Sequence, residues 1–332
     1  MTLRSSADTL ITVFGGSGFL GRHVVRALAR RNYRIRVAVR RPDLAGHLQP
    51  LGRVGQIQAV QANIRHRASV TTAVAGSDIV INLVGILFER GRQRFETVQS
   101  VGAENVALAT AAHNARMIHV SAIGAAERSR SAYGRAKWRG EELVLAATPS
   151  ATIFRPSIVF GPNDDFFNRF AAMALMSPVM PLIGGGRTRL QPVFAGDVAE
   201  AIAMAADGAT TAGATYELGG PEVYTFKELM QVVLRITARR RLLVPLPFGL
   251  AKVGALGSEL LSQLVPLPFL SQPLVTRDQV DLLRHDNVVS GDAVSAGRTL
   301  EGLGITPHPV DEIVPTYLWR FRTAGQFHRR VA

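Results

Sequence analysis

The chain has 332 residues, 47% of them hydrophobic and 19% charged, which is typical of a folded protein and excludes a disordered one. Its 38 lysine and arginine residues, only three of them lysine, outnumber 25 acidic residues and give a formal net charge of +13. There is no cysteine, which excludes disulfides, thiolate metal sites and cysteine nucleophiles. The basic excess predicts either a solvated arginine-rich surface or an anionic partner such as a phosphate, an anionic membrane surface or an acidic protein face.

The first residues contain no apolar stretch of the kind that a signal peptide needs. No apolar run approaches the roughly 18–20 residues that would span a bilayer. We therefore expect a cytoplasmic protein, and peripheral contact with the cytoplasmic face of the inner membrane stays open. We expect no nucleic-acid partner, because no basic stripe is interleaved with aromatic residues.

The first half of the chain alternates short apolar runs with helical patterns. Strands are predicted at 9–15, 34–40, 57–63, 78–85, 116–122 and 151–161, and helices at 19–31, 69–76, 96–115 and 131–147. Such alternation indicates right-handed βαβ units, and unbroken apolar runs indicate parallel strands buried on both faces. The sequence therefore predicts an α/β fold with a Rossmann-type doubly wound parallel sheet.

After residue 161 this alternation ends, and loops rich in Gly and Pro intervene. We expect residues 1–161 to form the Rossmann domain. Residues 162–332 are expected to form a smaller C-terminal α/β lobe for a substrate or partner, interleaved with the sheet.

Residues 242–275 form an unusual apolar stretch with proline pairs at both ends. A helical wheel separates apolar from polar positions, namely Leu250, Val253, Leu260 and Leu264 from Lys252, Glu259 and Gln263. Two interpretations stay open: a helix that covers the core of the lobe, and an apolar surface for a membrane or a larger complex. The tail 317–330 is rich in arginine and aromatic residues, a composition suited to interfaces.

Three glycines form a G-x-x-G-x-x-G pattern between the first strand and the first helix. A tight turn at this place lets backbone N–H groups approach a pyrophosphate, and the helix N-terminus adds its positive end. The pattern predicts a dinucleotide site. The residues expected to contact the cofactor there are Gly15, Ser17, Gly18, Phe19, Leu20 and Gly21.

The end of the second strand indicates which dinucleotide binds. Sites that prefer NAD place Asp or Glu there, whereas this strand ends with Arg40 and Arg41. A guanidinium matches a phosphate in a bidentate way, so we predict NADPH (NADP), recognised by its 2′-phosphate. The ends of the next strands are expected to line the cofactor with Asn63, Ile64, Leu83, Val84 and Gly85.

Tyr133 and Lys137 are four residues apart and share one helix face. A lysine cation beside a phenol favours the phenolate and lowers its pKa, which makes a usable proton donor or acceptor. Ser121, at the end of a strand, is placed to bind a substrate oxygen. Ser121, Tyr133 and Lys137 are thus the predicted catalytic residues of a carbonyl–alcohol hydride-transfer site, with Tyr133 and Lys137 also contacting the cofactor. The eight histidines show no ligand spacing, so no metal is expected.

These motifs, together with "FRPSIVFGP" and "QPVFAGDVAEAI", carry a family resemblance. Over residues 10 to about 220 the chain resembles an atypical or extended short-chain dehydrogenase/reductase. Segments such as "NLVGILFERG" and "PTYLWRFRTAGQF" extend the resemblance over nearly the whole chain. Within the superfamily the chain is most similar to the NADPH-binding accessory subunits of respiratory complex I, the NADH–ubiquinone oxidoreductase, and their bacterial relatives. The resemblance adds Pro156, Ser157 and Ile158 to the expected cofactor contacts.

The resemblance implies an accessory subunit associated with a respiratory NADH–quinone oxidoreductase, with NADPH as a structural cofactor and complex I subunits as partners. The alternative is a free NAD(P)-dependent reductase or nucleoside-diphosphate-sugar epimerase that acts on a carbonyl or alcohol. A redox sensor that responds to NADPH occupancy overlaps the first hypothesis. Whether the chain is an enzyme stays open, because Tyr133 and Lys137 also serve to bind the cofactor ribose.

Overall fold

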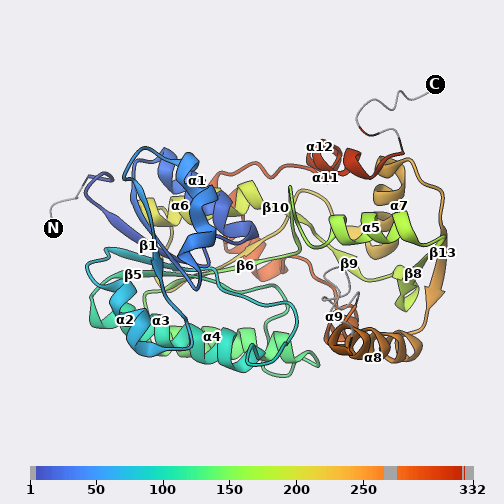
Figure 1. Cartoon of the computed structure of the whole chain (residues 1–332), viewed down its shortest axis with the longest axis horizontal. Helices are drawn as coiled ribbons and strands as arrows, with labels where there is room; N and C mark the ends of the chain where they lie inside the picture. The colour runs from blue at the N-terminus through green and yellow to red at the C-terminus, as the bar shows by residue number, and fades with distance from the viewer. Residues whose placement is uncertain (1–4, 265–274, 324, 326–332) are drawn as a thin grey trace. The chain divides into compact units, whose positions relative to one another are not determined.

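The computed structural model describes residues 5–264, 275–323 and 325 (Figure 1). The chain divides into two compact units. The first unit comprises Met1–Pro156, Ala195–Leu218 and Val289–Thr306. The second comprises Ser157–Phe194, Gly219–Val288 and Pro307–Ala332. The chain therefore passes between the two units several times.

The first unit is built on a seven-stranded parallel sheet with the strand order β11-β6-β5-β4-β1-β2-β3. The strands are β1 (Leu10–Phe14), β2 (Arg34–Val39), β3 (Ile57–Gln61), β4 (Ile79–Asn82), β5 (Arg116–Val120), β6 (Thr152–Pro156) and β11 (Thr215–Leu218). In the central strand β1, Val13 lies between Val37 of β2 and Ile81 of β4, and all three side chains are fully buried. The predicted Rossmann-type doubly wound parallel sheet is confirmed.

Helices cover both faces of this sheet, with α1 and α6 packed together on one face and α2, α3 and α4 on the other (Figure 1). The helices and helical turns of the unit are α1 (Phe19–Arg30), η1 (Pro42–Leu51), α2 (Arg67–Val74), η2 (Glu96–Ser100), α3 (Val101–Ala112), α4 (Ala132–Ala147), α6 (Ala195–Asp207), α10 (Gly291–Ser295) and η5 (Glu301–Leu303). The helix predicted at 96–115 thus begins with a π-helical turn, η2, before α3. At Gly140 of α4 an added Cβ would lie 2.3 Å from the backbone oxygen of Gln99, so glycine allows α4 to approach this turn.

The strand predicted at 151–161 is interrupted. β6 ends at Pro156, which has no N–H group to donate to a neighbouring strand. The next two residues leave the sheet, and the short strand β7 (Val159–Phe160) pairs with β10 (Val193–Phe194) in the second unit. There the Ser157 hydroxyl donates to the backbone oxygen of Asn287 at 2.9 Å.

Within its described residues, the second unit contains three small two-stranded sheets, β7 with β10, β9 with β12, and β8 with β13. Besides β7 and β10, the elements of this unit, strands of these sheets included, are α5 (Phe167–Met176), β8 (Val179–Ile183), η3 (Gly184–Gly186), β9 (Arg189–Leu190), β12 (Tyr224–Thr225), α7 (Phe226–Thr237), β13 (Leu242–Leu246), α8 (Phe248–Leu264), α9 (Arg277–Leu282), α11 (Val310–Ile313), α12 (Pro315–Leu318) and η6 (Trp319–Phe321).

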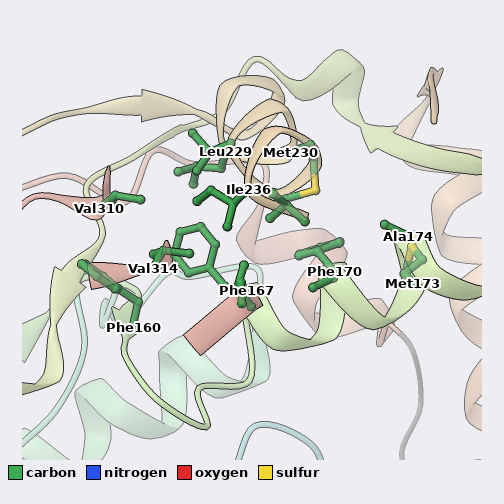
Figure 2. Close-up of a cluster of buried hydrophobic side chains, with 14 of the residues drawn as sticks. Phe160, Phe167, Phe170, Met173, Ala174, Leu229, Met230, Ile236, Val310 and Val314 are labelled. Atoms are coloured by element: carbon green, nitrogen blue, oxygen red, sulfur yellow. The ribbon is translucent and has the colours of Figure 1, made fainter. Parts of the chain in front are cut away.

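The core of the second unit lies between α5, α7 and the segment 310–318 (Figure 2). Phe167 and Phe170 of α5 share this cluster with Leu229, Met230 and Ile236 of α7 (Figure 2). Tyr317 and Leu318 are also buried, and the Tyr317 hydroxyl donates to Asp164 at 2.5 Å. The start of the tail 317–330 therefore belongs to the core, although its composition suggested an interface. Residue 324 and residues 326–330 of this tail lie outside the described part of the chain.

The stretch 242–275 forms β13 and α8, and residues 265–274 lie outside the described part. Ala251 and Ala255 of α8 are buried against Ile183 and Val280. The polar positions also face the protein, because Lys252 and Glu259 form ion pairs of 2.7 and 3.0 Å with residues of α9, Asp281 and Arg277.

Three large apolar side chains in the described part of α8 face outward, whereas Phe248 packs against the buried cluster. Leu250, Val253 and Leu256 are 63%, 69% and 40% exposed, and we call these three residues the outer face of α8. The structure therefore agrees with both interpretations of the stretch: the alanines of α8 cover part of a core cluster, and its outer face is an exposed apolar surface. Among the described residues, no helix is both long enough and apolar enough to cross a membrane.

Candidate active site

The glycine turn joins β1 to α1 through close backbone contacts. Gly15 has a φ of +79°, and its carbonyl oxygen accepts a hydrogen bond of 3.0 Å from the Gly18 N–H. An added Cβ at Gly21 would lie 2.3 Å from that same oxygen. Gly18 is the N-cap of α1 and offers no side-chain cap, so the first N–H groups of the helix are left for another acceptor. This geometry fits a pyrophosphate.

The predicted lining residues at the end of β4 reach the glycine turn. A Cβ at Gly15 would lie 3.3 Å from the carbonyl carbon of Leu83 and from the backbone N of Val84. The Val84 N–H donates to the Asn82 side chain at 3.1 Å, which fixes the chain at the point where it leaves the strand. The structure therefore brings Leu83 and Val84 next to the glycines, where a dinucleotide is predicted.

The two arginines after β2 have different partners. Arg41 donates from Nε and Nη2 to both oxygens of Asp43, at 2.7–3.2 Å. Arg40 is exposed and donates from Nη1 to Oε1 of Gln93 at 3.1 Å. Arg40 and Arg41 thus have different side-chain partners, although the sequence predicts the same contact with the 2′-phosphate for both.

The other predicted lining residues are already engaged within the protein. The Asn63 side chain accepts from the Arg65 N–H at 3.2 Å, and Ile64 packs under Gly102 of α3. Ser157 binds Asn287, as described above. Contacts of Asn63, Ile64, Pro156, Ser157 and Ile158 with the cofactor stay predictions.

The three predicted catalytic residues come from β5 and α4. Ser121 follows β5 and is buried, and no residue of the described chain hydrogen-bonds to its hydroxyl. Lys137 of α4 is buried and donates to the backbone oxygen of Val120 at 3.0 Å, one residue before Ser121. Its Nζ also lies 6.0 Å from the ring centroid of Tyr133. These contacts place Ser121, Tyr133 and Lys137 at the carboxyl end of β5.

Burial shapes the electrostatics of this site. It lowers the pKa of Lys137 to about 8, and the charge of Glu141 acts in the opposite direction. Glu141 itself accepts from Nε and Nη2 of Arg155 at 2.9 and 2.6 Å. Burial and the charge of Lys137 lower the pKa of His119 to about 3, so this imidazole stays neutral at pH 7. Lys137 is then the cation beside the Tyr133 ring, which favours the phenolate.

The sequence did not single out Gln99, which the structure places beside Lys137. A Cβ at Gly85 would lie 3.5 Å from Lys137 Nζ and 3.7 Å from Gln99 Oε1. Gln99 is 2% exposed, and within the described residues neither amide atom has a hydrogen-bond partner. Together with the Ser121 hydroxyl, these buried polar atoms fit a bound polar group such as a carboxamide or a substrate oxygen. A polar residue on a helix face between apolar neighbours was the available signal.

The comparisons with known proteins agree with this geometry. The model of the NAD dependent epimerase/dehydratase family matches residues 11–219. The mitochondrial NADH dehydrogenase (ubiquinone) 1 alpha subcomplex subunit 9 of Arabidopsis thaliana is 36% identical over 327 residues, covering 97% of this chain and 80% of the relative. The ceramide reductase of Caulobacter vibrioides is 32% identical over 257 residues, covering 76% of this chain and 79% of the reductase.

Among solved structures, the NADPH-dependent quinone oxidoreductase QOR2 of Escherichia coli, complexed with NADPH, has a TM-score of 0.70 and 19% identity to this chain. The superposition covers 93% of this chain and 99% of QOR2. At this identity the likeness concerns the fold.

Proposed function

Because this chain belongs to the NAD dependent epimerase/dehydratase family, we propose that it is an NADPH-binding, short-chain-dehydrogenase-like accessory subunit of a respiratory NADH–quinone oxidoreductase. The family assignment confirms the resemblance predicted from the motifs. The observation that carries the proposal is the 36% identity to the Arabidopsis subunit, which extends over 97% of the chain. The similarity therefore includes most of the second unit, well beyond the dinucleotide-binding motifs.

The glycine turn, Leu83, Val84 and Gly85 would hold the central part of a nicotinamide dinucleotide. Arg40 supports a preference for NADPH over NADH, because it is an exposed guanidinium at the end of β2. Bound NADPH would supply a hydride to a carbonyl. Lys137 would hold the ribose hydroxyls and favour the phenolate of Tyr133, while Tyr133 would exchange a proton with the substrate oxygen that Ser121 binds.

The association with a respiratory complex is tested by cell fractionation. Membranes are prepared at low and at high salt and solubilised mildly, and the complexes are separated on a native gel. We expect this chain to migrate with NADH–quinone oxidoreductase activity and its purified form to carry NADPH. A chain that stays soluble at low salt and never migrates with that activity would contradict the accessory-subunit function.

A free reductase is the second candidate. Ser121, Tyr133 and Lys137 are all present, and the Caulobacter relative is a ceramide reductase. Oxidation of bound NADPH on addition of a quinone, a sugar nucleotide or a long-chain ketone, lost in Tyr133→Phe with cofactor binding retained, would favour this candidate. NADPH that stays reduced in every case would favour a structural cofactor.

We further propose peripheral, salt-sensitive contact with the cytoplasmic face of the membrane. Basic residues close to an anionic surface contribute about 1 kcal/mol each. The net charge of +13 and the outer face of α8 support such contact. Flotation with vesicles of anionic lipid at increasing salt measures it, and equal binding to neutral vesicles would contradict the electrostatic part.

A further inference from the structure

A short hairpin follows β4 and is closed by its own hydrogen bonds. The backbones of Arg90 and Gln93 bond to each other in both directions at 3.0 Å, and Gly91 between them has a φ of +55°. At the base, the Glu89 carboxylate accepts from the Phe95 N–H at 2.8 Å and from Arg94 at 3.3 Å. We call residues 89–95 the arginine hairpin. These bonds give it a defined conformation.

The arginine hairpin lies across the carboxyl ends of the sheet strands, where the glycine turn also lies. In the sheet, β1 lies next to β4, and β2 and β3 follow on the far side of β1. The hairpin starts after β4, yet Gln93 accepts from Arg40 after β2 at 3.1 Å. The backbone oxygen of Arg92 accepts from Arg65, after β3, at 2.9 Å. To make both contacts the hairpin must pass the carboxyl end of β1, where the glycine turn begins.

The base of the hairpin touches one predicted catalytic residue, Tyr133. The ring of Phe95 meets the ring of Tyr133 edge to face, with 5.8 Å between centroids. One short element therefore contacts Tyr133 at one end and Arg40 at the other. This is the span that an extended dinucleotide would occupy between its nicotinamide and its adenosine.

The charges of the hairpin favour an anion at its Arg40 end. Arg90 and Arg92 are exposed on the hairpin. Arg41 is held by Asp43, whereas the side-chain partner of Arg40 within the described chain is the neutral amide of Gln93. Gln93 holds one edge of the Arg40 guanidinium through Nη1 and does not neutralise it.

We propose that the arginine hairpin is part of the dinucleotide site and that Gln93 is a specificity-determining residue, which positions Arg40 for the 2′-phosphate of NADPH. This inference rests on the proposed preference for NADPH. With Nη1 bound to Gln93, the Nε–Nη2 edge of Arg40 faces the phosphate, and the charge of the hairpin adds to the attraction. Arg41 takes no part.

Equilibrium affinities test the role of Gln93. NADPH, NADH and the fragment adenosine 2′,5′-bisphosphate are titrated into wild type, Gln93→Ala, Gln93→Glu and the control Arg41→Ala. We expect Gln93→Ala to weaken NADPH and the fragment about fivefold, as for the loss of one ordinary hydrogen bond, because Arg40 keeps its charge but loses the contact that positions it, and to leave NADH unchanged. Gln93→Glu is expected to weaken both more strongly, because a carboxylate neutralises Arg40 and repels the phosphate. Arg41→Ala should change either affinity less than twofold.

Limited proteolysis with trypsin gives a second, independent measurement, because the enzyme cleaves after Arg90 and Arg92. We expect saturating NADPH to slow cleavage at these two bonds several-fold more than it slows cleavage after Arg53, which lies outside the hairpin. A wild type that binds NADPH and NADH equally would overturn the proposed cofactor preference and this inference with it. A wild type that prefers NADPH, but with Gln93 variants of unchanged preference or with unprotected hairpin bonds, would overturn this inference alone.

Discussion

Lys137 keeps its ammonium group away from water, with the backbone oxygen of Val120 as its hydrogen-bond acceptor. Burial of a charge without a direct carboxylate partner is unfavourable, and this is why its pKa falls to about 8. The same burial places a cation within 6.0 Å of the Tyr133 ring centroid. At this residue the chemistry of the site and the stability of the fold oppose each other.

Replacing Lys137 should make that opposition measurable. The folded pKa of Lys137 is lower than its unfolded value, so its contribution to stability is present above the unfolded pKa and is lost as the pH falls through about 8. Relative to Lys137→Met, the cofactor-free wild type should therefore gain roughly 2–4 kcal/mol of unfolding free energy between pH 7 and pH 10.5. Denaturant unfolding of both proteins across this pH range measures this gain. A difference in unfolding free energy that does not change with pH would contradict the lowered pKa of Lys137. Lys137→Met should also weaken cofactor binding.

Gln99 is a second buried polar residue whose side chain is expected to lower the stability of the cofactor-free protein and to contribute to cofactor binding. Gln99→Met is expected to raise the unfolding free energy of the cofactor-free protein by about 1 kcal/mol, because it removes a buried amide that lacks partners. Cofactor affinity should fall, since the amide is available to a bound group. Gln56 is the matched control, because its amide donates to the backbone oxygens of Ala29 and Tyr33 at 2.9 and 3.0 Å. Gln56→Met should therefore destabilise the fold by about 1–3 kcal/mol. Equal effects of both changes on stability would be inconsistent with this explanation.

At the scale of elements, the strands were predictable because parallel strands buried on both faces appear as unbroken apolar runs. Each of the first five predicted strands is found with both ends within three residues of the predicted positions. The break after Pro156 was missed because the residues beyond it are just as apolar and pair in another sheet. The π-helical turn at 96–100 was missed because its composition is that of an ordinary helix.

The candidate site was predictable in part. Motif spacing indicated the glycines, Ser121, Tyr133 and Lys137, because these positions depend on local geometry. The sequence did not reveal the contact between Arg40 and Gln93, which are 53 positions apart. Nor did it decide which side of α8 faces the protein. A helical wheel shows two faces, and the buried alanines with the ion pairs to α9 decide between them.

The turn between β1 and α1 gives a prediction at this scale. Gly21→Ala should destabilise the protein by about 1–3 kcal/mol and abolish dinucleotide binding, because its Cβ would lie 2.3 Å from the Gly15 oxygen and 2.6 Å from Gly16 Cα. Gly46→Ala is the control, since nothing lies within 4 Å of an added Cβ there. Thermal unfolding and NADPH titration of both variants measure the effects. A Gly21→Ala protein that binds normally would show that close packing at this turn is unnecessary.

For the molecule as a whole, the outer face of α8 is the surface we expect to support docking. Leu250→Ser with Val253→Ser should reduce migration with NADH–quinone oxidoreductase activity and leave the unfolding free energy within about 0.5 kcal/mol of wild type, because both side chains are exposed. The control is Leu44→Ser with Val54→Ser, two exposed apolar residues of the first unit. Reduced migration in the control alone, or in neither protein, would contradict this role. A deletion from Tyr317 onward is unsuitable for this purpose, because it removes core side chains.

The passage of the chain in and out of the sheet unit has a consequence for its synthesis. When residue 161 leaves the ribosome, β6 is the outermost strand of a six-stranded sheet, and its partner β11 has not yet been made. The bond from Glu217 N to the backbone oxygen of Arg298 requires more than a hundred further residues. Until then the nascent protein presents an open apolar sheet edge, which is prone to aggregation. We expect chaperone binding to ribosome-bound chains to persist until about residue 300 has emerged, as ribosome profiling of chaperone-bound chains would show.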